Sequence, residues 1–247
     1  MNAVVISEVM FHHLVTAHIV TGSVGLLTLW VPIFARKGAK LHKWWGKVFA
    51  YALLATGTIA VGISICTLIA PLETHPAFDD AALIRAIFGW MMLYLAVLTM
   101  NLSWYGLQCI RNRRDHARNR HPVILIAQLL TFLAAANCFA QGIVVGWYLL
   151  SGMAIVGLAA AVLNTHFVLS ESPPPQEWLI QHSRGLVGAG ISVYTAFLAF
   201  GAVNYLPSAA FNPVLWATPT VVGISYLLYH QIRITRSRSL LANRVMR

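Results

Sequence analysis

The sequence predicts an all-α integral membrane protein, with a single bundle of about seven transmembrane helices that occupies the whole chain, residues 1–247. The composition is the first reason. Hydrophobic residues make up 58% of the chain and charged residues only 10%, whereas a soluble domain carries about 25% charged residues. So few polar side chains could not cover the surface of a folded protein in water. This composition excludes an ordinary soluble domain, a disordered segment and a disulfide-linked scaffold.

The second reason is the presence of seven segments long and apolar enough to cross a bilayer, which takes a helix of ~20 residues. They extend over residues 9–35, 48–70, 83–110, 123–142, 147–169, 185–205 and 214–234. Prolines between several of these segments, including the triplet at 173–175, end one helix before the next begins. The break between the fourth and fifth segments rests on Gly142 and Gly146, because one helix over residues 123–169 would be far too long for a single crossing. No linker separates two domains.

The third reason is the distribution of charge. The chain carries a net charge of +10, and all but two of its 17 Lys and Arg residues fall in three clusters after the first, third and seventh segments; the exceptions are Arg85 and Arg184. The clusters are Arg36, Lys37, Lys40, Lys43 and Lys47; Arg111, Arg113, Arg114, Arg118 and Arg120; and Arg233, Arg236, Arg238, Arg244 and Arg247. Cytoplasmic loops of membrane proteins are enriched in such residues, so we expect an external N-terminus and a cytoplasmic C-terminus. The expected partner is the lipid bilayer and not nucleic acid. Short hairpins and the lack of a large soluble domain suggest a bacterial cytoplasmic (inner) membrane.

Several functions lack the residues that they require. No Asp or Glu lies inside a predicted span, which disfavours a transporter built on an intramembrane carboxylate. Every lysine lies in or next to the first basic loop, so a retinal Schiff base in the seventh helix is also disfavoured. Metalloprotease, phosphate-loop and serine-hydrolase motifs are absent from the sequence. No motif assigns an enzymatic reaction, and catalytic residues are not identified.

Histidines are the side chains most able to carry chemistry here, because an imidazole in or near lipid can ligate haem iron, bind a metal or relay a proton. The candidate cofactor-binding residues are His18, His182, His166 and His121, and the expected cofactor is haem b or a quinone. Glycines follow two of them at helical spacing and would allow either close helix contact or a flat ligand. For the other histidines near helix ends, including His42 and His230, we favour a structural role.

Two further groups of polar residues have weaker signatures. His166 and His182 flank the proline-rich connection together with Glu177, and two imidazoles with a carboxylate could hold a divalent metal ion. Their spacing is not diagnostic of a metal site. Amide side chains inside the predicted spans, such as Asn101 and Gln128, must find partners in lipid. We expect them to join helices, and the alternative is that they line a polar cavity.

Several stretches resemble a family of bacterial multi-pass inner-membrane proteins, the domain of unknown function twenty-three-oh-six. They are His18 with Gly22 and Gly25; Leu41-His42-Lys43-Trp44-Trp45-Gly46-Lys47; Trp178-Leu179-Ile180-Gln181-His182; Thr195-Ala196-Phe197-Leu198; and Trp216-Ala217-Thr218-Pro219-Thr220. The resemblance spans most of the chain. It departs from the family pattern after His121, which is followed here by Pro122-Val123-Ile124. The resemblance implies the multi-pass fold and carries no activity over to this chain.

The functional expectation is a redox or accessory subunit of a membrane complex. Such a subunit would bind haem, a quinone or a lipid-like ligand through the histidines at its helix ends, and it would contact other subunits of that complex. Two alternatives belong to other classes: a transporter or permease-like carrier, and an assembly factor that holds no cofactor.

Overall fold

The computed structural model of the protein describes residues 3–201 and 212–245, and every regular element in these residues is helical. Six helices are long and apolar enough to cross a membrane: Val9–Phe34, Lys40–Ile69, Ala81–Arg111, Pro122–Val144, Tyr148–Leu169 and Glu177–Gly201. The all-helical, multi-pass architecture predicted from the sequence is therefore confirmed, with six candidate spans in the part of the chain that is described.

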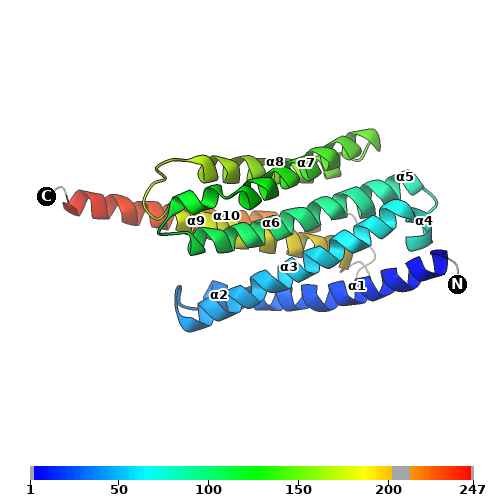
Figure 1. Ribbon diagram of the computed structural model, residues 1–247, viewed down its shortest axis with the longest axis horizontal. Coiled ribbons are helices and arrows are strands. Elements are labelled where there is room, and N and C mark those ends of the chain that lie inside the picture. The colour runs from blue at the N-terminus through cyan, green and yellow to red at the C-terminus, as the bar shows by residue number, and fades with distance from the viewer. Residues whose placement is uncertain (1–2, 202–211, 246–247) are drawn as a thin grey trace.

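The candidate spans consist of the following elements (Figure 1). They are α1 (Ala3–Thr28) with the short α2 (Trp30–Phe34); α3 (Lys40–Ile69); α5 (Ala81–Ile84), a π-helical turn (Arg85–Met91) and α6 (Met92–Arg111); α7 (Pro122–Val144); α8 (Tyr148–Leu169); and α9 (Glu177–Ala196) with a second π-helical turn (Phe197–Gly201). The short α4 (Pro71–Thr74) and a 3-10 turn (His116–Arg120) lie in connections, and α10 (Pro213–Val245) is the last helix.

The sequence predicts seven spans, and the described residues contain six candidate spans. Helix α10 is 33 residues long and contains Pro219, but it is not among the helices that are both long and apolar enough to cross a membrane. The third basic cluster begins only at Arg233, so the lower apolar character of residues 213–232 comes from polar side chains such as Thr218, Thr220, His230 and Gln231. The predicted end of the sixth span at Tyr205 lies outside the described residues.

Two helices begin earlier than their apolar segments. Helix α3 starts at Lys40 and not at residue 48, and α9 starts at Glu177 and not at residue 185. Hydropathy detects only the part of a helix inside the hydrocarbon core, whereas the helix can continue through the interfacial region where water solvates its charged side chains. As a result, His42 and His182 lie in the first two turns of helices rather than in loops.

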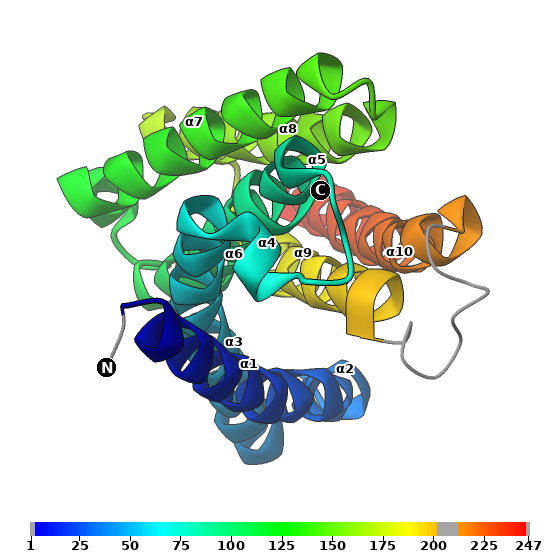
Figure 2. The ribbon, with the colours of Figure 1, turned by 90° about the vertical axis from the view of Figure 1, so that its right-hand side faces the viewer.

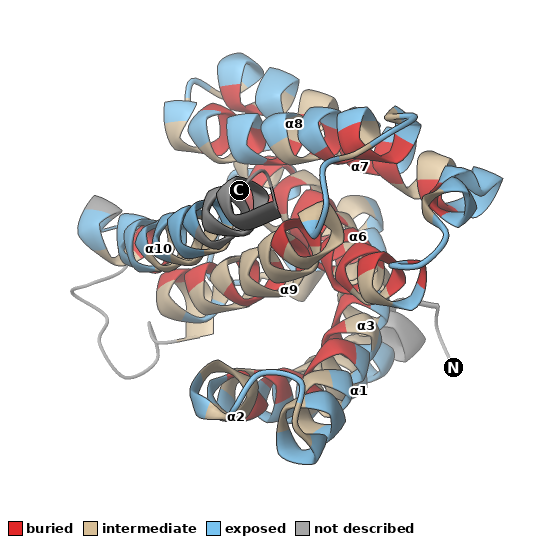
Figure 3. Cartoon of the chain, turned by 90° about the vertical axis from the view of Figure 1, so that its left-hand side faces the viewer, coloured by how far each residue is buried: buried red, intermediate tan, exposed pale blue. Residues whose placement is uncertain are grey.

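Helix α6 lies at the centre of the bundle. Half of its most apolar segment, 50%, is buried, against 17% for the first span. Viewed end-on, the α1–α3 pair lies on one side of α6 and the α7–α8 pair on the other, while α9 packs along α6 and α10 packs on α9 (Figure 2). Buried residues follow the faces that these helices turn toward one another (Figure 3).

A glycine ends α7 and allows α8 to fold back beside it. Gly146 has a φ of +70°, a conformation that costs glycine little and other residues more. The Gly146 N–H donates to the Ile143 carbonyl at 3.2 Å, and the Trp147 N–H donates to the Gly142 carbonyl at 2.9 Å. These two bonds form a Schellman motif, which satisfies carbonyls at the helix end. The predicted break between the fourth and fifth helices is therefore confirmed.

Helices α6 and α9 approach each other closely through two glycines. A Cβ atom added at Gly185 would lie 2.8 Å from the Cα of Gly106 and 2.8 Å from the carbonyl oxygen of Leu102. One turn further along α9, Ala189 is completely buried. The small residues at 185 and 189 thus mark a close helix contact, as the sequence predicted. This contact places the start of α9 against the backbone of α6.

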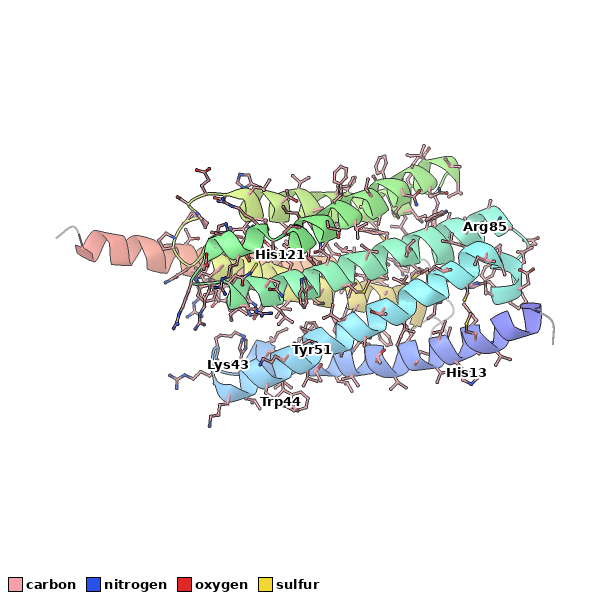
Figure 4. All side chains as sticks on the ribbon, in the orientation of Figure 1. His13, Lys43, Trp44, Tyr51, Arg85 and His121 are labelled. Carbon is pink, nitrogen blue, oxygen red and sulfur yellow. The ribbon has the colours of Figure 1, made fainter. Side chains whose placement is uncertain are left out.

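The segments that carry the first two basic clusters and the described part of the third lie at one end of the bundle. This end contains the connection between α2 and α3, the connection between α6 and α7, and the last turns of α10 (Figure 1). We call it the basic end. Lys43 and His121 lie there, whereas His13 and Arg85 lie toward the opposite end (Figure 4).

Candidate functional site

His182 lies in the second turn of α9, at the basic end. Its Nδ1–H donates a hydrogen bond of 2.8 Å to the carbonyl oxygen of Gly106 in α6. A carbonyl oxygen can only accept, so this bond requires the proton on Nδ1 and leaves a lone pair on Nε2 when the ring is neutral. The close packing of Gly106 and Gly185 brings the two helices near enough for this bond to form.

His42 lies in the first turn of α3, and its ring is held in a similar way. The Nδ1–H of His42 donates a hydrogen bond of 3.0 Å to the carbonyl oxygen of Pro32 in α2. The ammonium group of Lys37 donates to the same oxygen at 2.8 Å and to the Ile33 carbonyl at 2.6 Å. These carbonyls belong to the last turn of α2, where carbonyl groups have no N–H partners within the helix. Partial burial lowers the pKa of Lys37.

His42 and His182 both lie in the first turns of their helices at the basic end. They are within electrostatic range of each other, but α3 and α9 make few or no direct contacts in the described part of the chain. Within the described part of the chain, neither Nε2 atom has a hydrogen-bond partner. Two imidazoles with fixed Nδ1–H groups and free Nε2 atoms can ligate haem iron or accept a proton.

His18 is further from the basic end and joins α1 to α3. Its Nδ1–H donates a hydrogen bond of 3.2 Å to the Thr56 carbonyl. The glycines that follow it face α3: a Cβ added at Gly22 would lie 3.6 Å from the Thr56 side chain, and one at Gly25 would lie 2.5 Å from Leu53. These glycines therefore allow α1 to pack closely on α3. Of the two expectations, a neighbouring helix or a flat ligand, the structure shows the neighbouring helix on this face.

His121 and His166, two of the predicted cofactor-binding residues, lie at the start of α7 and near the end of α8. The Nδ1 atom of His121 accepts a hydrogen bond of 3.3 Å from the Val123 N–H and caps the start of α7. His166 is exposed near the end of α8. Across residues 3–201 and 212–245, no group of three or more His, Cys, Asp or Glu side chains is placed to hold a metal ion. The set of His166, His182 and Glu177 is therefore not assembled in the structure.

Glu177 belongs instead to a polar chain that enters the bundle. One of its carboxylate oxygens accepts a hydrogen bond of 2.9 Å from the Gln181 amide. The Gln181 carbonyl oxygen in turn accepts a hydrogen bond of 2.9 Å from the hydroxyl group of Tyr105. Gln181 and Tyr105 are buried. This chain fixes the first turns of α9 against α6, next to His182.

Three buried amides join α6, α7 and α8 at the centre of the bundle. Asn101 and Gln128 exchange two hydrogen bonds of 2.9 and 2.8 Å, and Asn164 donates a further bond of 3.2 Å to the Gln128 carbonyl oxygen. Each such bond between membrane helices contributes about 0.6 kcal/mol on average. The amides therefore connect helices, which is the role that the sequence favoured.

An aromatic cluster occupies the opposite end. The ring of His75 packs on Phe88 of the first π-helical turn, with 4.3 Å between centroids, and Phe88 lies 5.5 Å from Phe200 of the second. Phe200 in turn lies 5.1 Å from Trp216 of α10. Burial among these rings lowers the pKa of His75. The cluster packs the ends of three helices together.

Comparison with known proteins gives no relative of this chain. No family model, no curated protein and no solved structure matches it. Membership of the family that several stretches resemble therefore stays a prediction. The functional interpretation rests on the geometry of the side chains.

The sequence favours a structural role for His42 and does not reveal that this histidine lies within electrostatic range of His182. One sequence feature could have indicated the position of the His42 ring. Lys37 and His42 follow an apolar helix that must end before the basic loop. Cationic and imidazole groups near a helix C-terminus commonly bind its free carbonyls. The helix that lies on the other side of His42 is determined by packing between segments far apart in the sequence. No local sequence pattern indicates that packing.

Proposed function

We propose that this protein is a redox or accessory subunit of a membrane complex, and that it binds haem b or a quinone at the basic end between α3 and α9. His42 and His182 are the proposed binding residues. The observation that carries the proposal is that two imidazoles from different helices at the basic end, within electrostatic range of each other, each have the Nδ1–H bonded to a backbone carbonyl. The hydrogen bonds orient the rings, and each leaves an Nε2 lone pair for a ligand.

The charge around these histidines favours the same ligands. Lys37 and Lys43 lie near His42 in the chain and add positive charge to this part of the basic end. A neutral Nε2 can ligate haem iron or accept the proton of a quinol hydroxyl. The same cations would attract the carboxylates of a haem, which gives the basic end a second contact with such a ligand.

A reduced-minus-oxidised visible spectrum of the purified protein tests this proposal. A haem ligated by two imidazoles would give a Soret band and an alpha band, with close to one haem per chain. If the protein is colourless, organic extraction of the same sample should yield a quinone. A preparation from native membranes that contains neither group and takes up neither when they are added would refute the proposal and would favour a carrier or an assembly factor.

We further propose that α10 is a seventh span and that the basic end faces the cytoplasm of a bacterium, with the N-terminus outside. The position of the first two basic clusters and the described part of the third at one end supports this orientation, because positively charged loops remain on the cytoplasmic side. A reporter fused after Arg247 should be active as a cytoplasmic protein, and one inserted near Pro76 should report an external position. An external signal from the C-terminal fusion would contradict this topology.

A further inference from the structure

A groove runs between α1 and α3, and most of the residues that line it are exposed. It has a volume of about 450 Å³, within the ~300–1,000 Å³ of typical small-molecule sites. Val20 and Val24 of α1 and Val48 and Ala52 of α3 line its apolar part. The Thr21 hydroxyl, which also lies here, already donates to the Ala17 carbonyl at 2.9 Å. The walls therefore offer apolar contacts along most of their length.

Aromatic and cationic side chains lie where the groove reaches the basic end. Trp44, Lys47 and Tyr51 line this part, and the side chains of Trp44 and Tyr51 are 60% and 58% exposed. Lys43 and Tyr51 flank Trp44 along the same helix (Figure 4). Tryptophan and tyrosine prefer the level of lipid headgroups in membrane proteins. The groove thus extends from headgroup level toward the hydrocarbon core.

The cations at this mouth form no ion pair with an acidic side chain in the described part of the chain. The only ion pair in the described residues joins Arg118 to Asp115 in a different connection. The ammonium group of Lys47 makes no hydrogen bond or ion pair with any of the residues that the structure describes. Lys40, Lys43 and Lys47 recur at helical spacing on α3, so an unneutralised basic stripe leads to the groove.

We propose that this groove is a specific site for an anionic phospholipid of the leaflet at the basic end. Its phosphate would lie beside Lys47 and Lys43, with Trp44 at headgroup level, and one acyl chain would follow the groove past Val48, Ala52 and Val20. Basic pockets between transmembrane helices bind anionic headgroups in this way. The site is separate from His42 and His182, and it does not depend on the proposed redox function.

Lipid binding to the purified protein in detergent tests the site, with native mass spectrometry as the readout. Phosphatidylglycerol and phosphatidylcholine with identical acyl chains are the two probes. We expect the protein to retain phosphatidylglycerol preferentially. Lys47→Gln should weaken its binding about fivefold, whereas Lys40→Gln, outside the groove, should have little effect. Ala52→Phe fills the groove without changing charge and should also weaken binding, and Ala55→Phe at an exposed position of the same helix is its control.

Three results would overturn this proposal. Equal retention of the two lipids would show that the phosphate charge is not recognised. An equal effect of Lys47→Gln and Lys40→Gln would mean that the basic stripe attracts lipid without a defined site. Unchanged binding to Ala52→Phe would show that the groove holds no acyl chain. Each variant is scored only as the monodisperse, folded protein, and wild-type thermal stability in the absence of lipid is the criterion for folding.

Discussion

His182→Asn should abolish ligand binding while it leaves the fold nearly intact. The amide nitrogen of asparagine occupies about the position of the imidazole Nδ1, so it can still donate to the Gly106 carbonyl, whereas nothing replaces Nε2. We expect the affinity for haem or quinone to fall at least tenfold, which corresponds to about 1.4 kcal/mol. The stability should change by no more than about 0.5 kcal/mol. Ligand content per chain and thermal melting in detergent measure the two effects.

His13→Asn is the matched control for this substitution. The His13 Nδ1 also donates to a backbone carbonyl, that of Val9 at 2.7 Å, but the residue lies away from the basic end (Figure 4). The control should keep its ligand. The site assignment is wrong if His182→Asn retains wild-type ligand content, and it is also wrong if the two variants lose ligand equally. Loss of the folded state in His182→Asn would assign the residue to packing alone.

Gly185→Ala should destabilise the protein more than a single methyl group usually does. The added Cβ would meet the Gly106 Cα and the Leu102 carbonyl oxygen at 2.8 Å, and backbone atoms cannot turn aside as a flexible side chain can. Relief requires α6 and α9 to separate, which weakens the hydrogen bond from His182 to Gly106. Overpacking of this kind costs ~1–3 kcal/mol. We expect a lower melting temperature together with reduced ligand content.

Gly152→Ala in α8 provides the comparison, since no heavy atom lies within 4 Å of the Cβ it would add. Both changes place alanine inside a helix, where alanine is favoured over glycine by about 1 kcal/mol. The control should therefore be neutral or slightly stabilising. Equal melting temperatures for the two variants would mean that α6 and α9 are not in close contact at Gly185.

The sequence predicted those features that local composition determines. Apolar length identified six of the spans, and Gly146 marked the end of α7 because the left-handed turn requires a residue without Cβ. The buried amides Asn101 and Gln128 could be assigned to helix contacts because lipid offers them no other partner.

Features that depend on the packing of distant segments were not predictable in the same way. The hydrogen bonds of His42 to Pro32 and of His182 to Gly106 need α2, α3, α6 and α9 in their final positions. The glycines after His18 and His182 fit both a flat ligand and a neighbouring helix, and only the tertiary structure distinguishes the two. The early starts of α3 and α9 escaped hydropathy because charged residues at the interface can be helical without being apolar.

The π-helical turn at Arg85–Met91 determines how the span that contains α6 responds to the loss of one residue. A π-helical turn accommodates one residue more than the surrounding α-helix. Deletion of one residue there would restore regular α-helical winding and leave the segments on either side facing nearly the same neighbours, because the wide turn already absorbs the extra residue. Deletion of one residue from the regular part of α6 would instead rotate the preceding segment by about 100° and shift it by about 1.5 Å. That deletion would turn α5 and the connection that carries His75 away from Phe200. The π-helical turn is therefore a place where this span can lose a residue while both of its ends keep their contacts.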